Sequence, residues 1–103
     1  MSYRLVFLPE AREDIYEAAV WYRQRNPRVA REFTRRVESA TKRISQNPFQ
    51  FPLLDDEARH LVLDHYPYSI IYLIAEEEVV ILSCFHQRRD PAEWKRRLKR
   101  ERS

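Results

Sequence analysis

The segment with the clearest chemical potential is VVILSCFHQRRDPAEW, which runs from Val79 to Trp94. It begins as a β-branched apolar run that predicts a buried central strand, and it changes within a few residues into a polar cluster. The cluster contains His86, Arg88 and Arg89. An imidazole transfers protons near neutral pH, and guanidinium groups bind phosphates and carboxylates. We therefore predict the working surface of the protein at the end of this strand.

Asp90 and Pro91 follow the cluster and predict the start of a helix, with Asp90 as N-cap and Pro91 at the first helical position. Structural roles are the alternatives for the neighbouring residues. His86 is suited to capping the strand end by hydrogen bonding, and the arginines to ion pairs with Asp90 and Glu93. Trp94 is suited to anchoring the helix in the core. The sequence leaves both sets of roles open.

Residues that hold cofactors are scarce in this chain. It contains no glycine, which excludes the P-loop and dinucleotide-binding fingerprints. Cys84 is the only cysteine, so neither an intrachain disulfide nor a thiolate zinc site is predicted. His60, Asp64 and His65 do not share one strand face, and the acidic run 55–57 is typical of a solvated turn. We predict no cofactor and no metal.

The composition predicts one soluble domain spanning residues 1–103, because 44% of the residues are hydrophobic and 34% are charged. Neither a membrane span nor a signal peptide is recognisable, so we expect a cytoplasmic protein. The net charge is only +3, but residues 86–103 contain eight cationic and three acidic side chains. This basic segment favours an anionic partner, with a solvated tail as the alternative.

The elements that must position the polar cluster follow from hydrophobic periodicity. A short strand at 3–8 precedes two helices that meet at the break Asn26-Pro27. Strands are then predicted at 59–65, 68–75 and 79–85, and a basic helix begins at about residue 91. We predict an α+β fold of order β-α-α-β-β-β-α, with the helical hairpin packed on one face of a four-stranded, mainly antiparallel sheet. The second helix carries an uninterrupted apolar seam: Ala30, Phe33, Val37, Ala40 and Ile44.

Both faces of the last two predicted strands are apolar, whereas two helices cover only one face of a sheet. The other face requires a cover of its own. We expect this cover to be either the C-terminal helix or another chain.

The element order, the segment from Tyr68 to Tyr72 (YSIIY) and the closing FHQRRDP resemble the RelE/ParE family of bacterial toxins, as does LPEA at 8–11. The resemblance extends from Tyr3 to about Arg97. It implies the toxin of a two-gene type II toxin–antitoxin system. Its partner would be a cognate antitoxin that wraps the sheet and helices of the toxin and neutralises it.

This family includes two mechanisms. RelE-like members cleave messenger RNA on the ribosome, whereas ParE-like members bind and poison DNA gyrase without chemistry of their own. On the RelE pattern, the strand lysines fall near His60 and Val62, and one arginine falls on Ser69. A later arginine matches Arg88, but the terminal tyrosine lies near Trp94, which cannot transfer a proton.

These mismatches favour a ParE-like toxin that arrests growth by binding DNA gyrase. The alternative is a ribosome-dependent endoribonuclease that acts on messenger RNA, with a catalytic site rebuilt around His60, His86 and Arg88. A third possibility is a basic module that binds nucleic acid through salt-sensitive contacts. The predicted target-binding residues are Arg59, His86, Arg88, Arg89, Trp94, Arg96 and Arg97.

Overall fold

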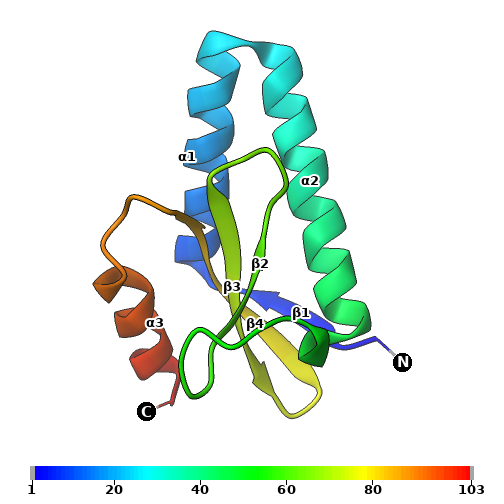
Figure 1. The fold of residues 1–103 in the computed structure, drawn as a ribbon, viewed down its shortest axis with the longest axis vertical. Coiled ribbons are helices and arrows are strands. Elements are labelled where there is room, and N and C mark those ends of the chain that lie inside the picture. The colour runs from blue at the N-terminus through cyan, green and yellow to red at the C-terminus, as the bar shows by residue number, and fades with distance from the viewer. Residues whose placement is uncertain (1, 103) are drawn as a thin grey trace.

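The computed structural model describes residues 2–102, and its elements follow the predicted order (Figure 1). The strand predicted at 59–65 is shorter and ends at Val62, and the last helix begins directly after Pro91. The elements are β1 (Arg4–Phe7), α1 (Pro9–Arg25), α2 (Pro27–Gln46), the 3₁₀ turn η1 (Pro48–Gln50), β2 (Arg59–Val62), β3 (Tyr68–Ala75), β4 (Glu78–His86) and α3 (Ala92–Arg102).

The sheet has the strand order β1-β4-β3-β2, so β4 and β3 are its central strands. β1 runs parallel to β4, with Leu5 opposite Val79, and the other two strand pairs are antiparallel. β4 is buried continuously from Val79 to Phe85. The prediction of a mainly antiparallel sheet built around this strand is confirmed.

Both hairpin turns of the sheet use a residue with a left-handed backbone, because the chain has no glycine to place there. His65, between β2 and β3, has a φ of 69°, and Glu76, between β3 and β4, has a φ of 57°. This conformation costs a residue with a Cβ atom roughly 1–2 kcal/mol. Packing between the strands and the helices must offset that cost.

The helical hairpin depends on Asn26, which ends α1 and caps α2. Its backbone N–H donates to the Tyr22 carbonyl at 2.7 Å, and its side-chain oxygen accepts from the Arg28 N–H at 3.0 Å. Pro27 occupies the first position of α2, where a missing N–H costs nothing. All five residues of the predicted seam on α2 are buried, so the helix packs as its periodicity indicates.

Aromatic rings join the hairpin to the beginning of β3. Phe33 is completely buried and lies 5.2 Å from Tyr22 and 5.4 Å from both Tyr66 and Tyr68, measured between ring centroids. Two of these contacts have the edge-to-face geometry that aromatic pairs favour. Tyr72 packs further along β3 and donates its hydroxyl proton to the Pro48 carbonyl at 2.6 Å. Burial raises the pKa of Tyr72 to about 12, so it remains a donor.

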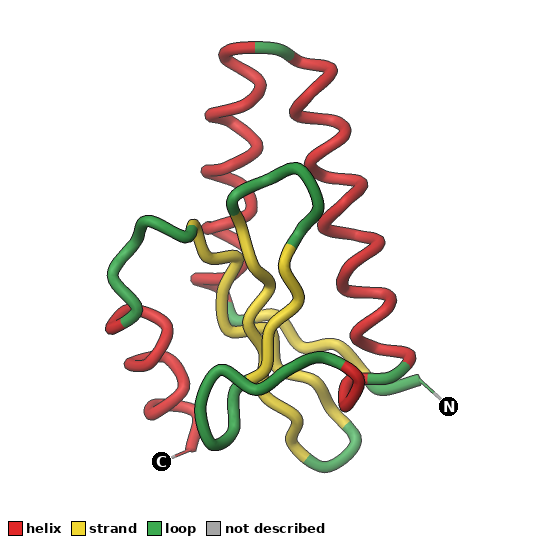
Figure 2. The backbone as a smooth tube through the Cα atoms, in the orientation of Figure 1, coloured by secondary structure: helices red, strands yellow, loops and turns green. Residues whose placement is uncertain are grey.

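The C-terminal helix supplies part of the predicted cover. The β4–α3 loop leads away from the strand, and α3 then returns alongside the sheet (Figure 2). Trp94 and Leu98 are buried, with exposures of 5% and 2%, and belong to the same core as β4. Arg100 reaches Glu10 on α1 at 2.5 Å, and Arg102 reaches Glu57 at 2.5 Å. Trp94 thus has the anchoring role that was one of its two predicted alternatives.

Replacing Phe33 with alanine should reduce the free energy of unfolding by about 3–5 kcal/mol, because the ring fills the junction between hairpin and sheet. Urea denaturation followed by circular dichroism measures this loss. Tyr16→Ala is the matched control, since that ring is 65% exposed, and it should change stability by less than about 0.5 kcal/mol. Equal effects of the two substitutions would contradict this account of the core.

Candidate functional site at the exit of β4

The end of β4 extends past its parallel neighbour. Ile81 lies opposite Phe7, the last residue of β1, and the N–H of Leu8 makes the final bond to the Ile81 carbonyl at 3.1 Å. On the β3 side, Tyr72 pairs with Ile81 and Ile71 pairs with Ser83, so Leu82 is an extra residue that forms a β-bulge. Beyond this bulge, the backbone groups on the β1 side of β4 need partners from elsewhere.

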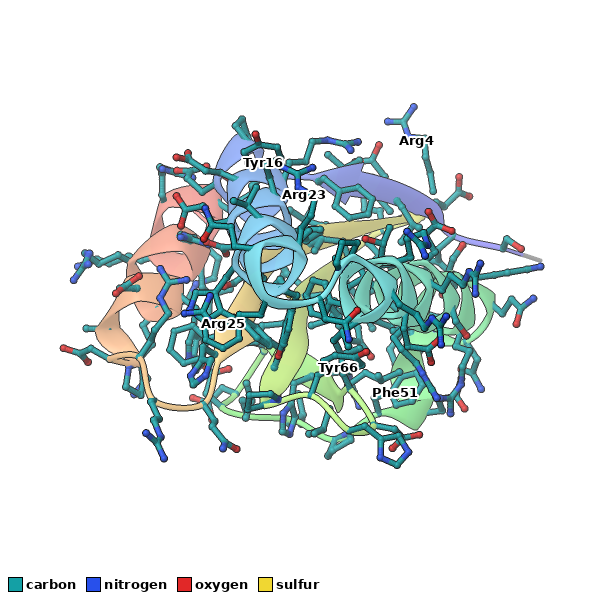
Figure 3. All side chains as sticks on the ribbon, turned by 90° about the horizontal axis from the view of Figure 1, so that it is seen from above. Arg4, Tyr16, Arg23, Arg25, Phe51 and Tyr66 are labelled. Atoms are coloured by element: carbon teal, nitrogen blue, oxygen red, sulfur yellow. The ribbon has the colours of Figure 1, made fainter. Side chains whose placement is uncertain are left out.

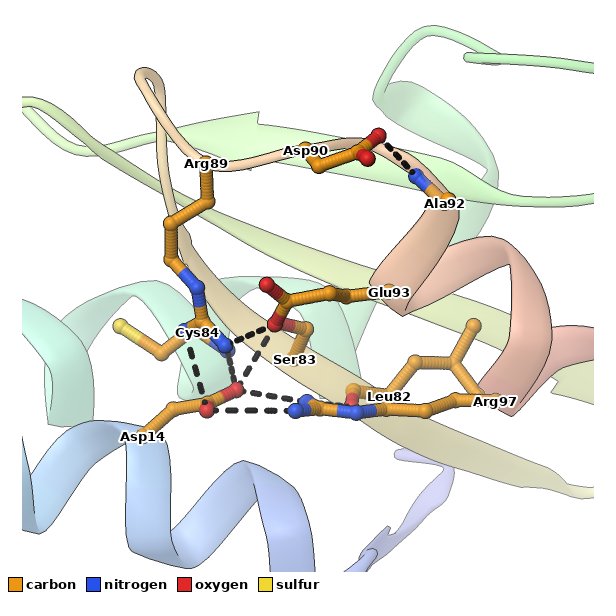
Figure 4. A network of polar contacts seen from close by, with 9 residues as sticks. All are labelled: Asp14, Leu82, Ser83, Cys84, Arg89, Asp90, Ala92, Glu93 and Arg97. Carbon is orange, nitrogen blue, oxygen red and sulfur yellow. Dashed lines mark hydrogen bonds and ion pairs between the residues drawn. The ribbon is translucent and has the colours of Figure 1, made fainter.

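Asp14 on α1 supplies one of these partners (Figure 4). Its Oδ2 accepts from the Cys84 N–H at 3.2 Å and from the Ser83 hydroxyl at 2.8 Å. The side chain is only 6% exposed. A carboxylate buried to this extent requires hydrogen bonds and opposite charges to compensate for its lost hydration.

Two arginines provide the opposite charge. Arg97 on α3 donates from Nη1 to Asp14 Oδ2 at 2.7 Å and to the Leu82 carbonyl at 2.9 Å. Arg89, in the loop before α3, donates from Nη1 to Asp14 Oδ1 at 3.2 Å. The Asp14 carboxylate therefore connects α1, the bulged end of β4, the β4–α3 loop and α3.

Arg89 is shared between Asp14 and Glu93 and lies over the ring of Phe85. Burial by itself would lower the pKa of the guanidinium, but the hydrogen bonds that it donates to Glu93 and Asp14 outweigh burial and raise the pKa. Arg89 is therefore permanently charged, and its charge is paired with carboxylates of the same chain. The predicted alternative of an ion pair with Glu93 describes Arg89 well, whereas Asp90 has a different role and accepts from the Ala92 N–H at 3.0 Å as the helix cap.

Sequence reasoning missed Asp14, which it treated as one of several acids favoured by the α1 dipole. A usable signal was present in the spacing. Ala11, Asp14, Ala18 and Tyr22 follow one helical face, and the structure buries the first three of them. A carboxylate on an apolar face predicts a buried cationic partner, although the sequence does not say which arginine supplies it.

A groove with a volume of about 560 Å³ lies beside this network, between α1 and the exit of β4. His86 lines it in edge-to-face contact with Tyr68, with the ring centroids 5.0 Å apart. His86 Nδ1 accepts from the Arg88 N–H at 3.0 Å, which places the ring proton of the neutral imidazole on Nε2. The predicted capping role of His86 is thus visible, and its Nε2 remains for another partner. The other lining residues are Asp14, Glu17, Ala18, Trp21, Tyr22, Pro67 and Arg89.

The remaining cations of the predicted surface differ in availability. Arg88 and Arg96 are exposed, and neither side chain makes an ion pair within residues 2–102. Arg97 has a side-chain exposure of only 13% and, like Arg89, is held by Asp14. The segment 86–97 therefore brings together six of the seven predicted target-binding residues, and it displays Arg88 and Arg96 most fully.

Arg59 and His60 lie elsewhere. The Arg59 guanidinium donates to the carbonyls of Phe49 at 3.2 Å and Phe51 at 2.7 Å, so it fixes the loop after α2. His60 lies opposite Ile71 across β2 and β3, whereas His86 lies opposite Tyr68. Three residues separate these partners along β3, and successive side chains alternate between faces. The two histidines therefore point to opposite faces of the sheet.

Two further features of the described part of the chain bear on its chemistry. No group of three or more His, Cys, Asp or Glu side chains in it is placed to hold a metal ion. None of its helices has the length and apolar character needed to cross a membrane.

Comparison with known proteins decides the family. The family model described as "ParE toxin of type II toxin-antitoxin system, parDE" matches residues 5–91. The chain belongs to the ParE toxin family. The match ends at Pro91, so it includes Asp14, the bulge and the β4 exit, and α3 lies beyond it.

Similar proteins agree with this membership. Toxin ParE2 from two strains of Mycobacterium tuberculosis, CDC 1551 / Oshkosh and ATCC 25618 / H37Rv, is 30% identical over 92 residues, which is 88% of each chain. A solved structure described as the chromosomal ParDE TA system from P. aeruginosa matches with a TM-score of 0.73. It is 20% identical and covers 82% of this chain and 96% of that one, so it supports the fold. This protein is thus a ParE-type toxin of a type II toxin–antitoxin system.

Asp14→Asn should reduce the free energy of unfolding by about 3–5 kcal/mol, because it leaves two partly buried guanidinium groups without their shared anion. Chemical denaturation measures the loss. The control is Glu13→Gln on the adjacent exposed position, which should be nearly neutral. A stability of Asp14→Asn within about 0.5 kcal/mol of the unmodified protein would show that the network is not structurally important.

Burial raises the pKa of the Cys84 thiol to about 12, so at pH 8 the folded protein holds it as an unreactive thiol. Modification by a thiol reagent should then proceed no faster than the protein opens, and added denaturant should accelerate it to the rate of a free cysteine. Immediate modification under native conditions would contradict the burial of the β4 exit beneath Asp14.

Proposed function

We propose that this ParE-type toxin arrests growth by binding DNA gyrase through the loop–helix segment 86–97, without catalysing a reaction itself. The observation that carries the proposal is the Asp14 network. It fixes the loop and α3 against the fold, so that Arg88, Arg96 and the Nε2 of His86 occupy a defined surface. A rigid cationic surface beside a groove suits recognition of an acidic protein partner.

The positions of the histidines support a binding role over messenger RNA cleavage. Cleavage by the 2′-hydroxyl requires an acid and a base on opposite sides of one phosphate. His60 and His86 lie on opposite faces of the sheet, about three residues or roughly 10 Å apart along it, so they cannot serve one phosphate together. Burial also lowers the pKa of His60, which makes it a poorer proton donor at neutral pH. The endoribonuclease alternative, with the ribosome and messenger RNA as partners, therefore has less support.

The partner that neutralises the toxin is a cognate antitoxin, and the sheet offers it an edge. β1 is an edge strand whose Arg4 and Leu8 N–H groups donate towards the β4 side, so the backbone groups of Leu5 and Phe7 face outwards. The opposite edge strand, β2, is already bonded through His60 to the Pro52 carbonyl. We place an extended antitoxin segment on β1, where it would add a strand to the sheet. Both proteins would act in the cytoplasm, where gyrase is found.

The double variant Arg88→Ala/Arg96→Ala should abolish growth arrest and raise the concentration needed to inhibit purified gyrase by about tenfold or more. Both residues are exposed, so the fold should be retained, and thermal denaturation checks this. His60→Ala is the matched variant outside the proposed surface and should remain fully toxic.

Nascent DNA and protein synthesis, followed in parallel after induction, separate the two mechanisms. An early stop in DNA synthesis is expected. An early stop in protein synthesis with cut messages, lost in His60→Ala, would overturn the gyrase proposal and establish the endoribonuclease alternative.

A further inference from the structure

Besides Arg88 and Arg96, a second group of exposed and unpaired cations in the described part of the chain lies on α2, away from the β4 exit. Arg28, Arg31, Arg35 and Lys42 are all exposed, and none of their side chains makes a hydrogen bond or ion pair with another residue in 2–102. By contrast, Arg89, Arg97, Arg100 and Arg102 near the C-terminus all pair with carboxylates. The folded protein therefore presents a cationic surface that the distribution of charge along the sequence does not reveal.

The four cations form a straight stripe. At about 100° per residue they fall within about 60° of arc, directly opposite the buried seam of α2. At about 1.5 Å per residue the stripe is about 21 Å long. Glu38 is the one acidic residue on the same face. We refer to Arg28, Arg31, Arg35 and Lys42 as the α2 stripe.

A groove of about 450 Å³ between α1 and α2 adjoins the stripe. Arg31 and Arg35 line one side of it, and Arg23 of α1 lines the other. Arg23 is exposed and also has no ion pair among the described residues. It lies on the opposite side of α1 from Arg25 and Tyr66 (Figure 3). Three arginines thus line one groove of the hairpin, together with Glu38.

We propose that the α2 stripe, together with Arg23, binds the phosphate backbone of duplex DNA. A guanidinium group can donate two parallel hydrogen bonds to two oxygens of one phosphate. Successive cations along a rigid helix also match the regular negative charge of a DNA backbone. Counting both strands, duplex DNA carries one negative charge per about 1.7 Å of its axis, so a cationic stripe of this length can face a dense array of phosphates. This inference does not depend on gyrase being the target.

The composition of the stripe distinguishes duplex DNA from other polyanions. An acidic peptide that folds on binding needs apolar pockets to offset its ordering cost, and the stripe consists of charged side chains. Single strands are bound largely by stacking on aromatic rings, and none stands within the stripe. Duplex RNA is recognised largely through its A-form shape and its 2′-hydroxyl groups across the minor groove, so a row of phosphate-binding cations does not by itself select it.

Fluorescence anisotropy with a labelled, random-sequence DNA duplex tests the proposal. The full chain should bind it with a steep salt dependence between about 50 and about 200 mM NaCl. Arg31→Gln/Arg35→Gln should weaken binding by roughly tenfold or more near 100 mM salt and make the log–log slope shallower by about two. Arg88→Gln/Arg96→Gln removes the same charge from the β4 exit and should leave the affinity within about threefold of the unmodified protein.

Each other outcome overturns the proposal. Equal loss in the two double variants would mean that net charge, and not the stripe, binds DNA. Tighter binding of duplex RNA or of a single strand, or displacement of the duplex by polyglutamate at equal charge, would assign the stripe to another polyanion. Absence of binding at low salt would leave the stripe as a solvated helix face. Gyrase inhibition measured on the same variants keeps this test separate from that of the proposed function.

Discussion

The buried carboxylate of Asp14 is the constraint on which the end of β4, the β4–α3 loop and α3 depend. β1 ends at Phe7 while β4 continues to His86, so the longer strand needs partners for its exposed edge. Asp14 and Arg97 bond to that edge from two different helices. A water-filled edge would also satisfy these groups, but it would not hold α3 in place. The ionic network therefore holds α3 in position as well as contributing to the stability of the fold.

The network also explains how a chain of this size keeps a defined surface on a short terminal helix. α3 is only 11 residues long, and isolated helices of that length are marginal in water. Trp94 and Leu98 supply its apolar contact, and Arg97 sets its orientation. The backbone positions of the exposed residues Arg88 and Arg96 are fixed by these buried neighbours. A side chain can present a defined surface only when the backbone beneath it is fixed.

Local patterns predicted most of the fold. The seam from Ala30 to Ile44, the break at Asn26 and the apolar strands around Tyr72 and Ile81 all depend on residues close together in sequence, where periodicity is informative.

The site was predicted less fully. Whether Arg89 and Arg97 face a target or a buried carboxylate depends on α1, about 75 and 83 residues away. Strand register, which places His60 and His86 on opposite faces, is likewise a property of the assembled sheet. Charge counted along the chain suggested a basic terminus. Folding pairs four arginines of that terminus with carboxylates, and it leaves exposed cations without an ion pair on α2 as well as at Arg88 and Arg96.

The long sequence separation of the Asp14 contacts has a consequence for when the surface at the β4 exit can form during synthesis. Asp14 is made early, whereas Ser83 and Arg97 follow 69 and 83 residues later. Forming contacts between residues so far apart in sequence costs loop-closure entropy. A nascent chain also cannot form them before their second partner emerges from the ribosome. The turn between α1 and α2 can form earlier, because the hydrogen bonds of Asn26 join residues close together in the sequence. The surface at the β4 exit is instead assembled only after α3 has been synthesised, because Arg97 of that helix is one of the partners of Asp14.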